Sequence, residues 1–200
     1  IDVNQRTTKE GASPLCMACV KGHIKVVQIL LQRDGIDVNL AATQNGSSPL
    51  YMACHERRTE VVQLLLERED VDVNQLLPQD GITALYYACQ QGYVEVVRCL
   101  LRCKNVDVNK PRKQVGYTPL FVATKNHHFE IVELLLATRK QEIDVNQQDR
   151  SGVFSLLMAC HYGHTEIVAL LLARKEIDVN EPDNNGRSPL SIACHLGFTE

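Results

Sequence analysis

The stretch SPLCMACVKGHIKVVQILLQRDGIDVN, residues 13–39, decides the fold because the chain repeats its pattern from end to end. Its closing tetrapeptide returns at residues 71–74, 106–109, 143–146 and 177–180, and the chain opens on it at residues 1–4. The asparagines that end these tetrapeptides are 35, 35, 35, 37 and 34 residues apart. The leucine at position 15 keeps step, at residues 50, 85, 120, 156 and 190. A fixed period of this length is typical of repeat proteins, whose units pack on their neighbours.

Each unit is predicted to contain a polar finger, a short helix, a turn and a second helix. Ser13 followed by Pro14 marks a helix start, because the hydroxyl caps a backbone N–H and proline at the first helical position loses no hydrogen bond. The pair recurs at residues 48–49, 118–119 and 188–189. The second helix is indicated by apolar residues at i, i+1, i+4 and i+5, first at 26, 27, 30 and 31 and then at 61, 96, 131 and 167 onward. This spacing gives one wide apolar helix face.

Glycine marks the turns. One set precedes the first helix of each unit, where a turn needs positive φ, at residues 11, 46, 81, 116, 152 and 186. A second set follows that helix, where a left-handed residue ends it, at residues 22, 92, 163 and 197. Arg57 and His127 stand at the second position in the two other units. We expect these two turns to be weaker or reshaped, because a left-handed non-glycine residue costs roughly 1 kcal/mol.

Composition excludes several classes of protein. The 200 residues are 44% hydrophobic and 22% charged, which indicates a globular chain with an apolar core. A net charge of -3, no tryptophan and 5% aromatic residues argue against a nucleic-acid partner. No apolar run is long enough to span or enter a membrane, and residues 1–30 do not resemble a signal peptide. The eight cysteines are too sparse for a disulfide scaffold, so a reducing, intracellular and cytoplasmic setting is expected.

The repeated sequence closely resembles the ankyrin repeat, whose pattern runs T-P-L-H-x-A-A-x-x-G-H-x-E-V-V-x-L-L-L and ends in D-V-N. The resemblance covers essentially the whole chain. It implies an all-α solenoid of stacked helix-turn-helix units with β-hairpin-like fingers, whose concave side commonly binds protein partners. The histidine of the family pattern is replaced here by Cys16, Tyr51, Tyr86, Phe121, Leu157 and Ser191.

The resemblance further implies one array over residues 1–200. Residues 1–4 are the end of a preceding repeat, five repeats occupy 5–39, 40–74, 75–109, 110–146 and 147–180, and residues 181–200 form a partial repeat. Because both ends fall within a unit, we expect the chain to be a segment of a longer solenoid, with its end repeats open.

No catalytic, metal or cofactor site is predicted. Cysteine recurs at one repeat position, at residues 19, 54, 89, 160 and 194, where we interpret it as a small core residue rather than a metal ligand. The CxxC of residues 16–19 has no second CxxC or histidine pair to complete a zinc site. Cys103 is left as an alternative, as a reactive surface thiol. No nucleophile elbow, phosphate-binding glycine loop or HExxH motif occurs, so the chain is interpreted as not an enzyme.

A partner is expected at the positions that the repeat leaves variable. These are the two residues after the Ala-Cys pair of the first helix, and the fingers. The candidate binding residues are His55, Glu56, Gln90, Gln91, Lys125, His161, Tyr162, Leu76, Leu77 and Arg112. The leucines are included because exposed apolar groups often mark contact sites. The finger at 110–113 is basic and that at 181–183 is acidic, which suggests a partner of graded charge.

The function predicted is therefore a non-catalytic protein-binding scaffold. Two alternatives stay open: a targeting or regulatory arm of a larger enzyme, channel or ligase, and a structural protein whose open ends stack head to tail into a filament. The identity of any partner is not contained in the pattern.

Overall fold

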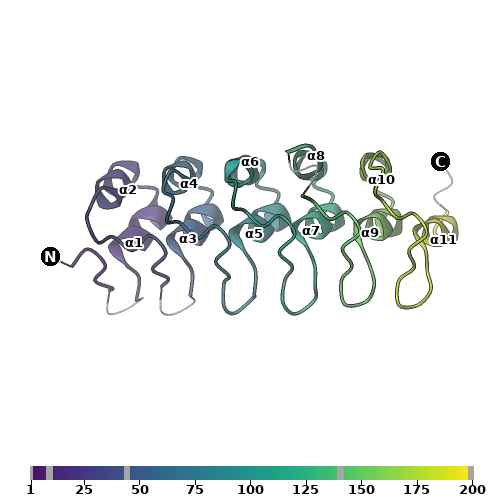
Figure 1. Ribbon diagram of the computed structural model, residues 1–200, viewed down its shortest axis with the longest axis horizontal. Helices are drawn as coiled ribbons and strands as arrows, with labels where there is room; N and C mark the ends of the chain where they lie inside the picture. The colour runs from purple at the N-terminus through teal and green to yellow at the C-terminus, as the bar shows by residue number, and fades with distance from the viewer. Residues whose placement is uncertain (1, 8–10, 43–45, 139–141, 198–200) are drawn as a thin grey trace. The chain divides into compact units, whose positions relative to one another are not determined.

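A computed structural model describes residues 2–7, 11–42, 46–138 and 142–197. These residues form eleven helices (Figure 1). They are α1 (Pro14–Lys21), α2 (Ile24–Leu31), α3 (Pro49–His55), α4 (Thr59–Leu66), α5 (Ala84–Gln91), α6 (Val94–Arg102), α7 (Pro119–Lys125), α8 (Phe129–Thr138), α9 (Ser155–Tyr162), α10 (Thr165–Leu172) and α11 (Pro189–His195). None of these described helices has the length and apolar character needed to cross a membrane.

The chain divides into two compact units. Unit 1 comprises Ile1–Ala88 and Glu95–Asp107, and unit 2 comprises Cys89–Val94 and Val108–Glu200. In unit 1, α1 packs beside α3 and α2 beside α4, while each helix also packs on its partner in the hairpin. In unit 2, α7, α9 and α11 form the corresponding inner row, and α8 and α10 the outer row. Within each unit the outer helices lie on one side of the inner helices and the fingers on the other (Figure 1).

The predicted helix starts are confirmed. The side chains of Ser13, Ser48, Thr118 and Ser188 each accept a hydrogen bond from the backbone N–H three residues on, and proline follows each of them. Thr83 caps α5 in the same way without a following proline. Phe154 precedes α9 and has no capping oxygen, as the sequence indicates.

The expectation that the turns at Arg57 and His127 are reshaped is wrong, while the expectation that they are weaker stays a prediction. Both residues adopt positive φ, at 55° and 57°, close to the 71° of Gly22. The backbone N–H after each of them donates to the carbonyl five residues back, Ala53 or Ala123, as His23 does to Ala18. The turn hydrogen bonds therefore hold the left-handed geometry, and a side chain is accommodated at the cost of backbone strain.

The core repeats with the sequence. Leu15, Leu50, Leu85, Leu120 and Leu156 are at most 3% exposed, whereas Leu190 at the same repeat position is 70% exposed. The apolar face of the outer helices is buried as predicted at most positions, but Val26 is 46% and Leu172 50% exposed. These two residues lie on α2 and α10, each of which has a packed outer helix on one side within its unit. Burial of the wide face therefore depends on neighbours on both sides.

Asparagine side chains join successive repeats inside each unit. The Nδ2 of Asn39 donates to the carbonyl of Asp70 at 2.7 Å, and its Oδ1 accepts from the N–H of Asp72 at 2.7 Å. Asn4, Asn74, Asn109 and Asn146 make the same pair of bonds. The asparagine of the tetrapeptide thus bridges two repeats, which explains its recurrence as a matter of stacking.

Candidate functional site

The fingers share one closing contact, which decides which of their side chains are buried. The N–H of the first residue in the contact donates to the carbonyl of the second, in the pairs 42–47, 77–82, 112–117, 149–153 and 183–187, at 2.8 to 3.0 Å. Leu77 and Ile82 form an isolated antiparallel bridge in this way. The fingers are accordingly hairpin-like, as the family resemblance implies.

The closing contact overturns the expected exposure of Leu77. Leu77 is only 8% exposed, because its place in the closing pair turns it against the protein, whereas Leu76 is half-buried. Ala42 holds the equivalent position and is also buried. Leu77 is thus a structural residue of the finger, and Leu76 is the leucine that reaches the surface.

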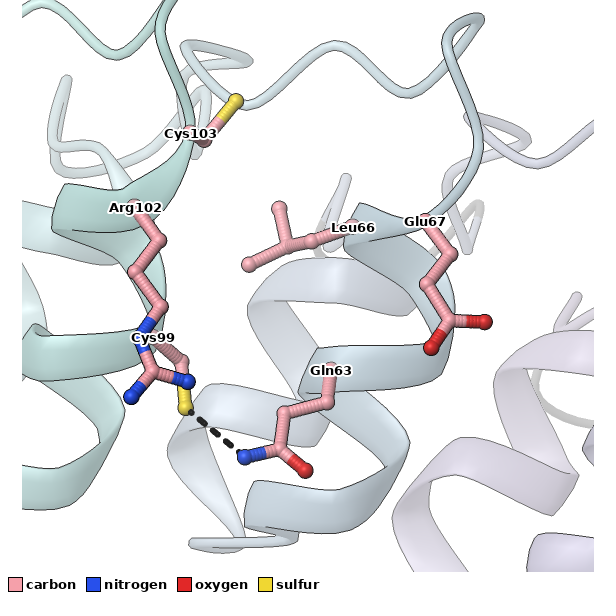
Figure 2. A pocket seen from close by; sticks show the side chains of 6 residues that line it. All are labelled: Gln63, Leu66, Glu67, Cys99, Arg102 and Cys103. Carbon is pink, nitrogen blue, oxygen red and sulfur yellow. Dashed lines mark hydrogen bonds between the residues drawn. The ribbon is translucent and has the colours of Figure 1, made fainter.

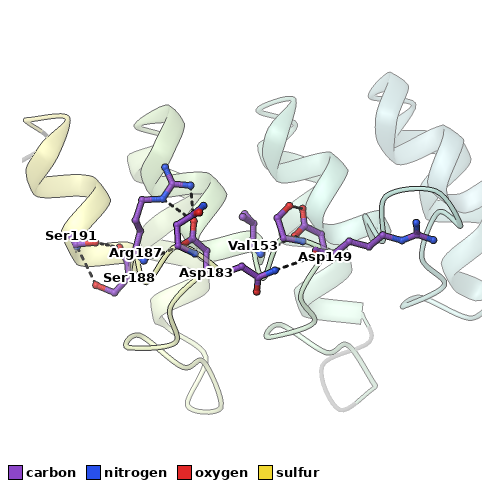
Figure 3. Close-up of polar contacts among 10 residues, drawn as sticks. Asp149, Val153, Asp183, Arg187, Ser188 and Ser191 are labelled. Carbon is purple, nitrogen blue, oxygen red and sulfur yellow. Dashed lines mark hydrogen bonds and ion pairs between the residues drawn. The ribbon is translucent and has the colours of Figure 1, made fainter.

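At the same closing position, two fingers of unit 2 carry aspartates that organise their own turns, Asp149 and Asp183 (Figure 3). Asp149 Oδ1 accepts from the N–H groups of Ser151 and Val153, both at 2.8 Å. Asp183 accepts from the N–H of Arg187 at 2.9 Å and pairs with the Arg187 guanidinium at 2.6 Å. Burial raises the pKa of Asp183, but Arg187 and the backbone N–H donors outweigh it and leave the pKa at about 2.

In unit 1, the last turn of α3 carries an ordered ring cluster. The His55 ring stacks on Tyr87 with centroids 5.1 Å apart, and Tyr51 packs on Tyr87 at 5.4 Å. His55 Nδ1 lies 2.9 Å from Glu56 Oε1, with the two side chains 45% and 36% exposed. Burial, reinforced by Tyr87 and Asp80, raises the pKa of Tyr51, so its phenol stays neutral. The structure therefore brings His55 and Glu56 together and adds Tyr87, a residue that the sequence pattern did not single out.

In unit 2, the glutamines at the end of α5 play different parts. The carbonyl of Gln90 accepts from Asn126 Nδ2 at 2.8 Å and lies 3.1 Å from His128 Nε2, while its side chain is half-buried. Gln91 is exposed. Gln90 thus helps to seat the following repeat through its backbone, whereas the Gln91 side chain is accessible.

Tyr162 is an accessible aromatic residue among the candidates, at 47% exposure. Its ring meets His161 edge-on at 5.0 Å and stacks on His164 at 5.7 Å. His164 in turn stacks on His127 at 4.1 Å, and His127 lies 3.6 Å from Glu166. Burial and the neighbouring His127 lower the pKa of His164. Tyr162 therefore lies at the end of a column of rings beside the helix turn and packs on two of its neighbours.

Lys125 and Arg112 both lie beside Tyr117. Lys125 Nζ is 5.1 Å from the centre of the Tyr117 ring, which also stacks on Phe121 at 4.3 Å. Arg112 faces Tyr117 across the finger, since its N–H donates to the Tyr117 carbonyl at 2.9 Å. The spacing of residues 112 and 117 within one finger could have shown this pairing, but the contact with Lys125 depends on how the finger meets α7.

The cysteines behave as core residues. Cys19, Cys54, Cys89 and Cys160 are buried, and burial raises the pKa of each of these thiols. Cys194 of α11 is exposed, so the interpretation as a core residue is wrong at this position. Within the described residues no cluster of three His, Cys, Asp or Glu side chains is arranged to hold a metal ion.

A cavity of about 370 Å³ lies between the outer helices α4 and α6 of unit 1 (Figure 2). Gln63 Nε2 donates to the Cys99 sulfur at 3.5 Å, and the sulfur of Cys103 lies at the opposite end of the cavity (Figure 2). The two thiols therefore do not converge on one point, and this cavity contains none of the candidate binding residues.

The repeating helix pairs, the hairpin-like fingers and the accessible last turns of the inner helices define a repeat protein of the ankyrin type. Three matches to the family model for ankyrin repeats, over residues 1–76, 69–149 and 141–200, show that the chain belongs to this family. It is an all-α ankyrin-repeat solenoid by fold. Ankyrin repeats in general are protein–protein interaction modules and are typically non-catalytic.

Several solved structures are similar. The ankyrin repeat domain of Bcl-3, a member of the IkappaB family, is 24% identical with a TM-score of 0.86, covering 96% of this chain and 82% of that one; this likeness concerns the fold alone. An ankyrin repeat domain from Acinetobacter baumannii AYE is 27% identical with a TM-score of 0.82, covering 92% of both chains. The ankyrin repeat protein EF0377 is also 27% identical at 0.82, covering 96% of this chain and 95% of that one. The search of curated proteins gave no significant match.

Proposed function

We propose that this chain is a non-catalytic protein-binding module and that its partner contacts the last turns of the inner helices together with the fingers. The observation that carries the proposal is the set of accessible side chains that the repeat core does not require but holds in place. His55 is stacked on Tyr87 although its side chain is 45% exposed, and Tyr162 is stacked on His164 although it is 47% exposed.

Ordered, accessible rings favour binding for a thermodynamic reason. Association has to immobilise interface side chains, at about 0.5–1.5 kcal/mol for each mobile one. Rings that are already packed on a neighbour have lost much of that freedom before the partner arrives. Tyrosine is also enriched among the residues that dominate interface energetics. Tyr162 is therefore the expected anchor in unit 2 and the His55–Tyr87 pair the expected anchor in unit 1.

The proposal is tested with matched triple variants used as bait. The surface variant is His55→Ala, Gln91→Ala and Tyr162→Ala. The control variant is Gln28→Ala, Ile29→Ala and Glu133→Ala, which removes exposed side chains from the outer helices α2 and α8. Proteins captured from extracts of the source cells are quantified by mass spectrometry after circular dichroism has shown that both variants are folded.

We expect one or more proteins to be captured by the unmodified chain and by the control variant. The captured amount of these proteins should be lower by about tenfold or more on the surface variant, because losing an anchor costs about 1–2 kcal/mol or more. Equal capture by the surface variant, with loss on the control variant, would place the binding site on the outer helices and refute the proposal.

A further inference from the structure

Two neighbouring fingers of unit 2 concentrate positive charge. The fingers are residues 110–117 and 147–153, and the last residue of α7 lies beside the first of them. Together they carry five cations, Lys110, Arg112, Lys113, Lys125 and Arg150, and a single carboxylate, that of Asp149. This basic finger surface stands out in a chain whose net charge is -3.

Backbone contacts hold the two fingers together. The Arg150 N–H donates to the Val115 carbonyl at 3.2 Å, and the Arg150 guanidinium donates to the Lys113 carbonyl. Gly116 has a φ of 84°, and a Cβ there would lie 3.2 Å from backbone atoms of Asp149 and Arg150, so a side chain would be strained and would crowd the second finger. These contacts fix the backbone of Lys113 against Arg150.

The one carboxylate in the basic finger surface is engaged in its own turn. Asp149 Oδ1 accepts from the N–H groups of Ser151 and Val153, and Oδ2 accepts from the Ser151 hydroxyl at 3.3 Å (Figure 3). Its acceptors thus point into the second finger. The cations are set out along both fingers, with Lys113 and Arg150 exposed.

We propose that the basic finger surface binds an acidic segment of a protein partner, an extended stretch rich in Asp and Glu. This inference rests on the proposed function and adds the chemistry of the partner. Opposite charges across an interface guide encounter and select against wrong partners. The next finger, residues 181–187, carries two carboxylates, Glu181 and Asp183, and one cation, Arg187, which is paired with Asp183. The carboxylate left without a cation in that finger is that of Glu181, which accepts from Gln148 at 3.0 Å. The charge therefore favours acidic residues of a partner over the fingers 110–117 and 147–153, and not over the finger 181–187.

A peptide fits this surface better than a nucleic acid does. Binding of single-stranded nucleic acid relies on aromatic faces on which bases stack. The aromatic ring within this surface is that of Tyr117, which is stacked on Phe121 and has the Lys125 ammonium over it. This half-buried ring is thus already in contact with Phe121 and Lys125, and the surface offers charge with donors in place of a stacking platform.

The test uses the chain itself and defined probes in fluorescence anisotropy. The probes are a short labelled peptide of alternating Glu and Gly, the same peptide with Gln in place of Glu, and an oligothymidine. The finger variant is Lys110→Gln with Lys113→Gln. The matched control is Lys25→Gln with Lys175→Gln, which removes the same formal charge from α2 and from the residues after α10. Circular dichroism verifies that both variants are folded.

We expect the Glu peptide to bind the unmodified chain and to bind the finger variant about fivefold more weakly. Its affinity for the control variant should equal that for the unmodified chain. Its affinity for the unmodified chain falls as salt is added, because exposed charges are screened, and this arm needs no substitution. Equal binding of the Gln peptide, or an equal loss in the control variant, would overturn the inference. Oligothymidine binding that is tighter than that of the Glu peptide and is lost in the finger variant would also overturn the inference.

The two proposals fail in different ways. If the Glu peptide does not discriminate between the variants while His55→Ala, Gln91→Ala and Tyr162→Ala still releases partners from the bait, the binding module stands and its acidic partner is refuted. If the triple variant keeps every partner and the Glu peptide still requires Lys110 and Lys113, the main contact lies on the fingers and the role of the inner-helix rings is refuted.

Discussion

Replacing Asn39 by Ala tests whether asparagine side chains hold the repeats together. The substitution removes two hydrogen bonds of 2.7 Å, one to the carbonyl of Asp70 and one from the N–H of Asp72. A hydrogen bond contributes about 0.5–1.5 kcal/mol net, and these two groups lie near the surface, where water replaces part of the loss. We therefore expect the free energy of unfolding to fall by about 1.5 kcal/mol, which corresponds to about 4 °C in the melting temperature of a chain of this size.

Asn180 supplies the matched control. It stands at the same repeat position, and in the described part of the chain its hydrogen bond is local, from its own N–H to Asp178 Oδ1 at 2.9 Å. Asn180→Ala keeps that backbone bond and is expected to change the free energy of unfolding by less than about 0.5 kcal/mol. Both variants are measured by urea unfolding followed by far-ultraviolet circular dichroism. Equal losses for Asn39→Ala and Asn180→Ala would refute the bridging role, since they would show that the side chain acts within its own loop.

Three further predictions concern strain, pH and the finger core. Arg57→Gly relieves a positive φ and should raise the free energy of unfolding by about 0.5–1 kcal/mol in urea; a loss would show that the Arg57 side chain contributes more than the strain costs. Because the pKa of His164 is lowered in the folded chain, unfolding at acidic pH takes up a proton. The contribution of His164 to stability is therefore full above the ordinary histidine pKa of about 6.5, which the unfolded chain retains, and is lost as pH falls through the folded-state pKa. His164→Gln should accordingly show a smaller drop in melting temperature than the unmodified chain between about pH 7.5 and about pH 5.5, and an equal drop would assign the effect to other groups. Leu77→Ala should cost about 2–3 kcal/mol in urea unfolding and Leu76→Ala under about 1 kcal/mol, and the reverse order would contradict the burial of Leu77.

The sequence was sufficient for the helices and their limits because those signals are local. Ser13 with Pro14 and the glycine at position 22 act within a few residues of the helix that they begin or end, and both are found as predicted. The recurring Leu15 position is buried at residues 15, 50, 85, 120 and 156, but Leu190 is 70% exposed, so burial also depends on the neighbouring repeat. Repetition thus makes one local pattern informative for the whole fold.

The arrangement of the candidate residues was less predictable because it depends on contacts between repeats. The burial of Leu77 follows from the closing pair with Ile82, which composition alone does not reveal. The stack of His127 on His164 joins residues of successive repeats, and only the packing of those repeats brings the rings to 4.1 Å. Arg57 was correctly placed at a strained position, but its turn keeps the glycine geometry because the surrounding hydrogen bonds impose it.

Photo-crosslinking of a bound partner tests most directly which surface this chain uses. A photoreactive phenylalanine analogue is placed singly at Gln91 or Lys125, on the inner helices, and at Gln28 or Glu133, on the outer helices. We predict that the first two positions crosslink to the same partner protein and that the last two do not. Crosslinks from the outer-helix positions alone would contradict the assignment of binding to the inner helices and fingers.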